Sequence, residues 1–421
     1  MKSKFRSRLL VPAAILASAA LVLSGCSATG EPAKAESLNL WLPSPFAGES
    51  SESAQAAWTS ILAPFEEEND VTVDVTLIPW ASYEDKYLTG VSSTDGPDLG
   101  YMYGEMIGDY IVNGAVVPFE GLSSTAADNM LYLNQGKVNG KQYSLPFVVG
   151  AMRVLWANMD ILKAAGVSAI PTTWDEFLAV SAKITASGET SLMQPWGDPQ
   201  RSMMNESFFP FLWQAGGQIL SADRTKTAFN DGSGLSAAKY LMELMDSGAM
   251  PSTVTGLTKN EVESSFFAGD TAFLFGSNGI ADQITESGIN ADYLPSLQGK
   301  QRGTFVASDS LVLLKSCPDV KLCTSLAEFI LAGDQMAKFH SDIVAYPPIG
   351  KDEAVTSDDP FIQDYRANAD SLVSLPVAAG SAGVYNSLYI NLQQMLLGQK
   401  TPEQALEDAA VSGDASLKQA Q

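Results

Sequence analysis

The sequence predicts an α/β fold divided into two lobes. A short apolar strand over Ser37–Leu42 precedes an amphipathic helix, and a strand with period-two alternation follows that helix. Strand, helix and strand in this order form a right-handed βαβ unit, which begins a parallel sheet. Once an N-terminal leader of 25 residues is set aside, 396 residues remain. Because this length exceeds the usual size of one hydrophobic core, we expect two lobes.

The first βαβ unit is defined by its apolar positions. Its opening strand contains the apolar run Leu38–Leu42. The following helix has an apolar stripe that consists of Trp58, Ile61, Leu62 and Phe65. The second strand, Val71–Leu77, alternates apolar and polar residues, which is typical of a strand with one buried face.

Two later helices carry clear start signals. Thr173 precedes one helix as a predicted N-cap, and Glu176 follows it three residues later. The other helix opens with Thr401 as the cap, Pro402 at the first helical position and Gln404 as a reciprocal capping residue. No internal repeat or heptad pattern accompanies these elements.

The N-terminus has the features of an export signal. Four basic residues, Lys2, Lys4, Arg6 and Arg8, precede an apolar run from Leu9 to Leu23. The run ends at Leu23-Ser24-Gly25-Cys26, which resembles a lipobox in which Cys26 receives a diacylglycerol group. We therefore expect residues 1–25 to be a lipoprotein signal peptide and residues 26–36 to be a flexible tether. An ordinary secretory signal with an incidental cysteine is the alternative.

The charge balance argues against a nucleic-acid partner. Without the leader, the chain has 21 basic and 48 acidic residues, a net charge of −27. Such a surface repels phosphate groups, so we expect no nucleic-acid partner. After the leader, no uncharged apolar segment approaches 18 residues, so membrane attachment would come from the lipid alone. Cys317 and Cys323 either form a disulfide across a short loop or remain two buried thiols.

Motifs for catalysis are largely absent. His340 is the one histidine, it falls in a predicted helix, and no metal-ligand spacing surrounds it. There is no Gly-x-Ser-x-Gly turn, no phosphate-binding loop and no dinucleotide fingerprint. The sequence therefore predicts no enzyme, no metal and no cofactor. A glycoside hydrolase needs only two carboxylates, so it remains an alternative in a chain with 48 acids.

Short motifs recur in a defined order over more than 300 residues. They are Asp95–Leu99, Lys141–Phe147, Trp156–Asn158, Pro171–Glu176, Phe267–Phe273 with the turn Gly276–Gly279, and Asn391–Ala410. Each motif is common by itself. In this order they resemble the family 1 extracellular solute-binding proteins of ABC sugar importers, which include the maltose-binding protein.

The resemblance implies a two-lobed, periplasmic-binding-protein-like fold of type II. Three interlobe crossings would fall near Val148–Arg153, Phe305–Asp309 and Tyr346–Pro348. The N-lobe would comprise residues 37–148 plus 308–346, and the C-lobe residues 152–304 plus 350–421. A monomer of this kind, lipid-anchored at the extracellular face of the plasma membrane, would close its cleft around a ligand. It would then deliver the ligand to the permease subunits of an ABC transporter.

The resemblance also implies a carbohydrate ligand and places side chains in the cleft. Sugar C–H faces stack on aromatic rings, whereas sugar hydroxyls bond to carboxylate, amide and guanidinium groups. The expected ligand-binding residues are Ser44, Phe46, Tyr103, Glu105, Arg153, Trp196, Glu206, Phe209, Asn278, Asp309 and Tyr385. For the aromatic residues the alternative is core packing, and for the acids it is an ordinary place on an acidic surface.

Two departures from the maltose binder argue against maltose as the ligand. Gly150 stands where that protein has a glutamate, and Gly279 stands where it has a cleft tryptophan. Trp196 and Arg153 are the expected replacements. A receptor of the same fold for a polyamine or a peptide is the main alternative, and a secreted carbohydrate-active enzyme is a further one.

Overall fold

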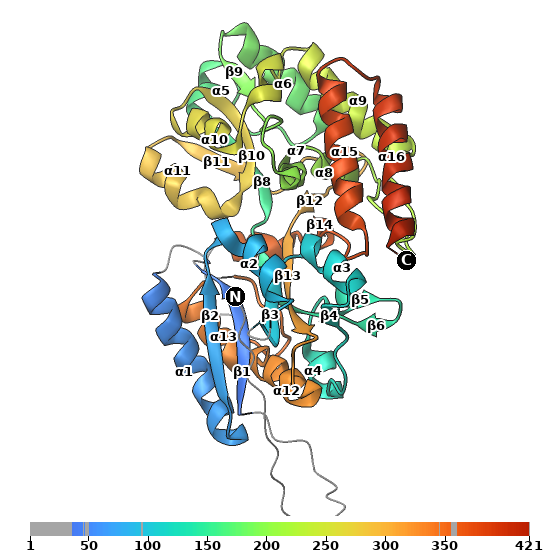
Figure 1. Cartoon of the computed structure of the whole chain (residues 1–421). Helices are drawn as coiled ribbons and strands as arrows, with labels where there is room; N and C mark the ends of the chain where they lie inside the picture. Colours follow the sequence, from blue (N-terminus) through green and yellow to red (C-terminus); the bar gives the residue numbers. More distant parts are fainter. Residues whose placement is uncertain are drawn as a thin grey trace, which may run out of the picture. The chain divides into compact units, whose positions relative to one another are not determined.

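The computed structural model describes residues 36–44, 46, 50–93, 96–344, 346–354 and 360–420. Two β-sheets, each with its own apolar core and its own helices, make up this part of the chain (Figure 1). The predicted α/β class is therefore confirmed. The leader and Cys26 lie outside the described residues, so their predicted roles remain predictions.

The first sheet has six described strands in the order β2-β1-β3-β13-β4, with β7 paired to β13. Their bounds are β1 Ser37–Pro43, β2 Thr72–Ile78, β3 Leu99–Met102, β4 Val116–Val117, β7 Ser144–Gly150 and β13 Ala307–Leu314. β1 is parallel to both β2 and β3, whereas β13 is antiparallel to β3, β4 and β7. The carboxyl ends of β1, β2 and β3 therefore meet at one edge of the sheet.

The predicted βαβ unit forms the beginning of this sheet. Helix α1 (Ser51–Asn69) connects β1 to β2 and buries the four expected side chains, Trp58, Ile61, Leu62 and Phe65. The Trp58 ring packs against the rings of Phe147 and Phe339, with centroids 6.1 and 5.5 Å away. The other helices of this lobe are α2 Tyr83–Gly90, α3 Gly104–Val112, α4 Ser124–Asn129, α12 Val320–Ile330 and α13 Gly333–Asp342.

The second sheet has four described strands in the order β11-β8-β10-β9. Their bounds are β8 Arg153–Asn158, β9 Thr190–Leu192, β10 Thr271–Ser277 and β11 Ala291–Leu294. The accompanying helices are α5 Met159–Ala164, α6 Trp174–Ala186, α7 Met204–Ser207, α8 Phe209–Gln214, α9 Gly232–Asp246, α10 Lys259–Phe267, α11 Ala281–Ser287, α15 Ser381–Leu396 and α16 Pro402–Gln419. Helices α15 and α16 pack side by side (Figure 1).

Shorter elements connect these layers. They are the hairpin strands β5 Lys137–Val138 and β6 Lys141–Gln142, the strands β12 Thr304–Phe305 and β14 Leu372–Val373, and helix α14 Pro360–Ala367. The 3-10 turns are η1 Trp80–Ser82, η2 Leu133–Gly136, η3 Arg201–Met203, η4 Ser252–Gly256, η5 Asn278–Ile280 and η6 Ala369–Ser371. β12 and β14 pair in parallel beside the point where the chain passes between the sheets.

Both predicted helix starts are confirmed. The Thr173 hydroxyl accepts from the Glu176 N–H at 3.2 Å, although the Glu176 carboxylate bonds to the Thr172 N–H at 2.8 Å and not to that of Thr173. At the other helix, Thr401 and Gln404 form a complete capping box around Pro402.

The chain passes from one sheet to the other at short segments. It leaves the first sheet after β7, enters the second at β8, and returns through β12 to β13. The third passage was expected at Tyr346–Pro348. However, Gly350 still bridges to Met130, and the Asp352 N–H bonds to the Asn129 side chain at 2.9 Å. Residues 350–352 therefore pack with the first lobe, where the sequence predicted the start of the second.

Two sequence features have a defined place in the fold. Cys317 and Cys323 form a disulfide between the end of the β13 segment and α12. His340 lies on α13, and its Nδ1 contacts the Glu353 carboxylate. In the part of the chain that the structure describes, no helix has the length and apolarity to span a bilayer, and no cluster of side chains is placed to bind a metal ion.

Candidate ligand site between the two sheets

A pocket of about 680 Å³ lies between the two lobes. The first sheet and its connections supply Trp80, Tyr83, Glu84, Asp85, Tyr103, Glu105, Ala307 and Asp309. The second lobe and the connecting strands supply Ala151, Arg153, Pro199, Gln200, Arg201, Ser202, Asn205 and Phe305. The volume falls within the range typical of small-molecule sites.

The parallel strands of the first sheet position the pocket. Trp80 lies on η1, directly after β2, and Tyr103 lies between β3 and α3. Pro79 favours the end of β2 because proline has no N–H to donate to a ladder. Since the carboxyl ends of these strands meet, both aromatic side chains reach the same opening, as is typical of ligand sites in open α/β sheets.

Aromatic surface comes from both sides of the pocket. Trp80 is 42% exposed and packs beside Tyr83, with ring centroids 5.2 Å apart. Phe305, from β12, lies under the guanidinium of Arg153, which is 5.2 Å from the ring centroid. The pocket therefore offers flat apolar surfaces next to charged groups.

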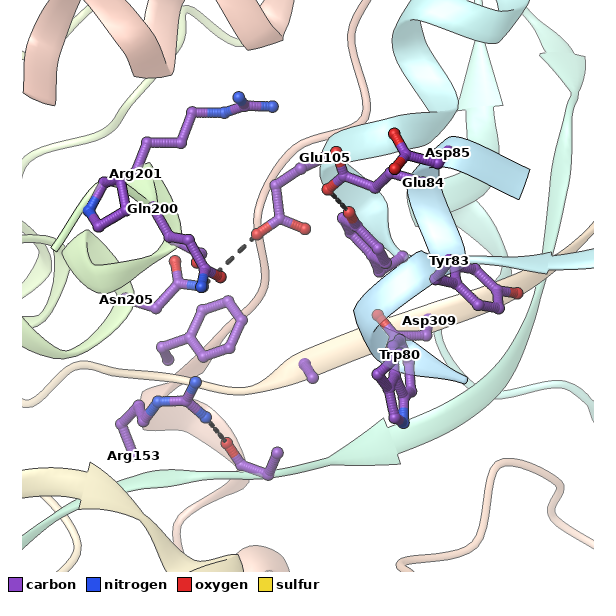
Figure 2. Close-up of a pocket in the computed structure, with 16 residues that line it drawn as sticks. Trp80, Tyr83, Glu84, Asp85, Glu105, Arg153, Gln200, Arg201, Asn205 and Asp309 are labelled. Carbon is purple, nitrogen blue, oxygen red and sulfur yellow. Dashed lines mark hydrogen bonds between the residues drawn. The ribbon is translucent and has the colours of Figure 1, made fainter. Parts of the chain in front are cut away.

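Four carboxylates line the pocket, on elements of the first lobe (Figure 2). The Tyr103 hydroxyl donates to Glu84, and the Tyr101 hydroxyl donates to Asp309. Burial raises the pKa of Glu105, although its bond from Asn205 and the nearby arginines oppose the shift. Burial also raises the pKa of Asp309, to about 7. These two carboxyl groups therefore lose part of their ordinary preference for the ionised form.

Two arginines line the opposite side, and both already have partners. Arg153 donates from Nε to Glu206 at 3.0 Å and from Nη1 to the Ala151 carbonyl at 2.7 Å. Burial raises the pKa of Glu206, while the charge of Arg153 opposes that effect. Arg201, on η3, donates from Nη1 to Asn386 of α15 at 3.3 Å.

One polar contact joins the two sides directly. The Asn205 Nδ2 on α7 donates to the Glu105 Oε1 on α3 at 3.5 Å, as the dashed line in Figure 2 shows. Asn205 is only 3% exposed, and its Oδ1 has no hydrogen-bond partner among the described residues. Because this contact is long, the Glu105 carboxylate and the Asn205 amide can still form a hydrogen bond with a ligand.

Four of the residues expected from the sequence line this pocket: Tyr103, Glu105, Arg153 and Asp309. Glu206 lies behind Arg153 as its buried partner. The other expected residues, Ser44, Phe46, Trp196, Phe209, Asn278 and Tyr385, do not line it.

The aromatic residues that miss the pocket are packed into the cores. Trp196 is 1% exposed and stacks on Tyr389, with ring centroids 5.9 Å apart. Phe209 packs against Trp213 and Tyr385. Core packing, the alternative stated for these rings, therefore describes their positions in the structure.

The remaining three residues occupy other places. The Phe46 ring packs against Tyr101 and Phe339 in the first core. Ser44 is buried at the end of β1, where its N–H bonds to Ile78. Asn278 begins η5, and its N–H bonds to the Met152 carbonyl at 2.9 Å.

Sequence reasoning did not single out several pocket residues. They are Trp80, Tyr83, Glu84, Asp85, Gln200, Arg201, Asn205 and Phe305, among others. Trp80 could have been predicted to lie at the pocket, because it follows the end of a predicted parallel strand, as Tyr103 does. The segment around Arg201 has no comparable signal, since no strand or motif precedes it.

The fold and the pocket define a two-lobed receptor for a small solute. A family model for bacterial extracellular solute-binding proteins matches residues 60–370, and the chain belongs to this family.

Individual relatives agree with this assignment. A protein of Brucella abortus (strain 2308) that is named as a binding protein is 26% identical over 373 residues, covering 84% of this chain and 88% of that protein. The galactooligosaccharide-binding protein of Bacillus subtilis (strain 168) is 24% identical over 370 residues, covering 85% and 86%. The GacH receptor of Streptomyces glaucescens, solved unliganded and with acarbose, has a TM-score of 0.71 at 18% identity. That comparison covers 91% of this chain and 99% of the receptor chain, and it shows a shared fold.

Proposed function

We propose that this chain captures a carbohydrate in the pocket between its lobes and delivers it to the permease of an ABC importer. The observation that carries the proposal is the combination of side chains in that pocket. Trp80 and Phe305 offer aromatic surface, while carboxylate, amide and guanidinium groups lie beside them. Sugars present both apolar C–H faces and hydroxyl groups, so they match such a lining.

The relatives support this ligand class. The Bacillus subtilis relative is named for galactooligosaccharides, and the GacH receptor was solved with acarbose. The departures at Gly150 and Gly279 still argue against maltose, because neither position supplies a side chain for it.

Ligand capture would work by lobe closure. A sugar held between Trp80 of the first lobe and Arg153 of the second would bond to both, so it would favour the arrangement that brings them together. The Glu105–Asn205 contact already joins the same two sides. No bond in the ligand needs to break, and the family comprises solute-binding proteins, so the ligand should be recovered intact.

The anchor and location belong to the same proposal. A diacylglycerol group on Cys26 would hold the protein at the extracellular face of the plasma membrane, after removal of residues 1–25. Mass spectrometry of the mature N-terminus tests this step. A lipid-modified Cys26 supports it, whereas cleavage elsewhere without lipid would leave an ordinary secreted protein.

A thermal-shift screen of the purified chain tests the ligand class. The panel contains monosaccharides, oligosaccharides, polyamines and peptides, and a true ligand raises the melting temperature as its concentration increases. Stabilisation by a carbohydrate that is recovered unchanged supports the proposal. Stabilisation only by polyamines or peptides contradicts the carbohydrate assignment, and conversion of the sugar to products contradicts the receptor assignment.

A further inference from the structure

The pocket lining has twice as many acidic side chains as basic ones. Four carboxylates line it, against two arginines. The bond that Glu105 accepts from another side chain, Asn205, is long, and no ion pair joins any of the four carboxylates to a basic side chain within the described residues. The lining therefore carries an excess of negative charge when its acids are ionised.

The arginines offset this excess only in part, because two guanidinium groups face four carboxylates and one of the two is already paired with a buried acid. The charge of Arg153 is matched by Glu206, which lies behind the pocket wall and is 3% exposed. Arg201 donates from Nη1 to Asn386 of α15, and its charge opposes the raised pKa of Glu105. Its Nε is buried without a partner among the described residues, so it remains available to one ligand oxygen.

Asn205 gives the most specific indication of what is missing. Its side chain lies at the pocket wall beside Glu105, and its Oδ1 is a buried acceptor that no described group satisfies (Figure 2). A buried polar atom without a partner is costly, so this oxygen is suited to a donor on the ligand. A donor on this oxygen would lie near the Glu105 carboxylate, because the Nδ2 of the same amide is 3.5 Å from Glu105 Oε1.

We propose that the carbohydrate is an amino sugar, whose protonated amine binds Glu105 and the Asn205 Oδ1 in the field of Asp309. The inference rests on the proposed function and narrows its ligand class. An ammonium group supplies three donors and a positive charge, which matches two acceptors at one place and the excess of carboxylates around them.

A neutral sugar is a poorer match for the same lining. Closure around it would remove water from Glu105 and Asp309 without supplying a countercharge, and burial of an uncompensated charge is unfavourable. The two carboxyl groups already influence each other, because the charge of Glu105 contributes to the raised pKa of Asp309.

Calorimetric titration with matched sugar pairs tests the proposal. The pairs are glucose with glucosamine, galactose with galactosamine, and β-1,4-linked oligomers of glucose with those of glucosamine, at a pH where the amine is protonated. The N-acetylated forms serve as a third member of each set, because acetylation removes the charge. The full chain is titrated in a detergent without a sugar headgroup.

The variants Glu105→Gln and Asp309→Asn test whether the charges of these two carboxylates cause the preference for the amine. Glu105→Gln keeps an oxygen for Asn205 but removes the negative charge. The matched control is Glu286→Gln, which makes the same change at an exposed position on α11. Melting curves of all variants establish that each is folded.

The proposal predicts that, in at least one set, the amine binds about tenfold or more tightly than its neutral partners. Glu105→Gln should remove that preference, whereas Glu286→Gln should keep it. Equal or tighter binding of the neutral sugars would overturn the amino-sugar inference and leave the carbohydrate receptor intact. Binding of no sugar, amine or neutral, across these sets and the earlier panel would overturn both.

Discussion

Arg153 and Glu206 form an ion pair of 3.0 Å in the wall of the pocket, and the Glu206 side chain is 3% exposed. The two residues come from β8 and α7, which are 53 residues apart in sequence. The pair holds the Arg153 guanidinium over the ring of Phe305, where it can meet a ligand. Glu206 thus holds Arg153 in place and does not itself line the pocket.

Replacing one member of this pair should destabilise the protein. In Arg153→Met, Glu206 becomes a buried carboxylate that has lost its ion-pair partner, so the free energy of unfolding should fall by about 3 kcal/mol. Urea titration measures this change. The control Lys239→Met breaks the pair with Glu403, whose side chains are 57% and 54% exposed, and should cost less than about 0.5 kcal/mol.

The loss of unfolding free energy in Arg153→Met should also depend on pH. Protonation of Glu206 removes the buried charge, so the variant should approach the wild type at acidic pH and differ most at alkaline pH. If Arg153→Met loses the same free energy of unfolding at every pH, then lost packing, and not charge, accounts for the loss.

Trp80 should contribute directly to sugar binding. Trp80→Ala removes the exposed aromatic face and should weaken the best carbohydrate ligand by about tenfold, whereas Trp80→Phe should keep much of the affinity. The control Leu88→Ala shortens a side chain that is 69% exposed on α2 and does not line the pocket. If Trp80→Ala binds as the wild type does, the sugar does not stack at this position.

The stability of the unliganded protein should fall as the pH rises from about 4 to about 7. Burial raises the pKa of Asp309 from 3.8 to about 7, so in this range the folded protein holds a proton that the unfolded chain releases. Asp309→Asn should therefore flatten part of the dependence of the melting temperature on pH. The rest of this pH dependence should persist in the variant, because the pKa values of Glu105 and Glu206 are also raised. If the melting temperature of Asp309→Asn changes with pH as steeply as that of the wild type, Asp309 does not have this role.

The disulfide should add to the stability of the first lobe. Cys317 and Cys323 close a short loop, and the double variant Cys317→Ser/Cys323→Ser should lose about 2 kcal/mol of unfolding free energy. A reducing agent should lower the stability of the wild type by a similar amount and leave the double variant unchanged. If the wild type does not respond to reduction, the bond contributes nothing measurable.

The parts of the fold that depend on neighbouring residues were predictable from the sequence. Thr173 caps α6 through a residue three positions later, and α1 buries an apolar stripe that its own periodicity defines. The place of β13 is different, because it pairs with β3 and β7 across about 200 and 160 residues. Local patterns contain no information on such pairings, and only the resemblance to a family indicated this return to the first sheet.

The lining of the candidate site was predictable where strands lead into it. Tyr103 and Glu105 directly follow a strand of the parallel sheet, and Trp80 offered the same signal. Trp196 was placed in the cleft from its position in the chain, yet it stacks on Tyr389, 193 residues further on. The sequence does not show which aromatic residues pack against partners so far away in the chain. It therefore does not distinguish aromatic rings in the cleft from those in the core.

A crystal structure of the chain with the carbohydrate that stabilises it most would show directly whether the pocket between the lobes binds sugar. We expect a sugar between the lobes, with a ring face on Trp80 and polar contacts to Arg153 and Glu105. If the ligand is an amino sugar, its nitrogen should lie next to Glu105 and Asn205. A sugar bound elsewhere on the chain, with the pocket between the sheets empty, would contradict the account.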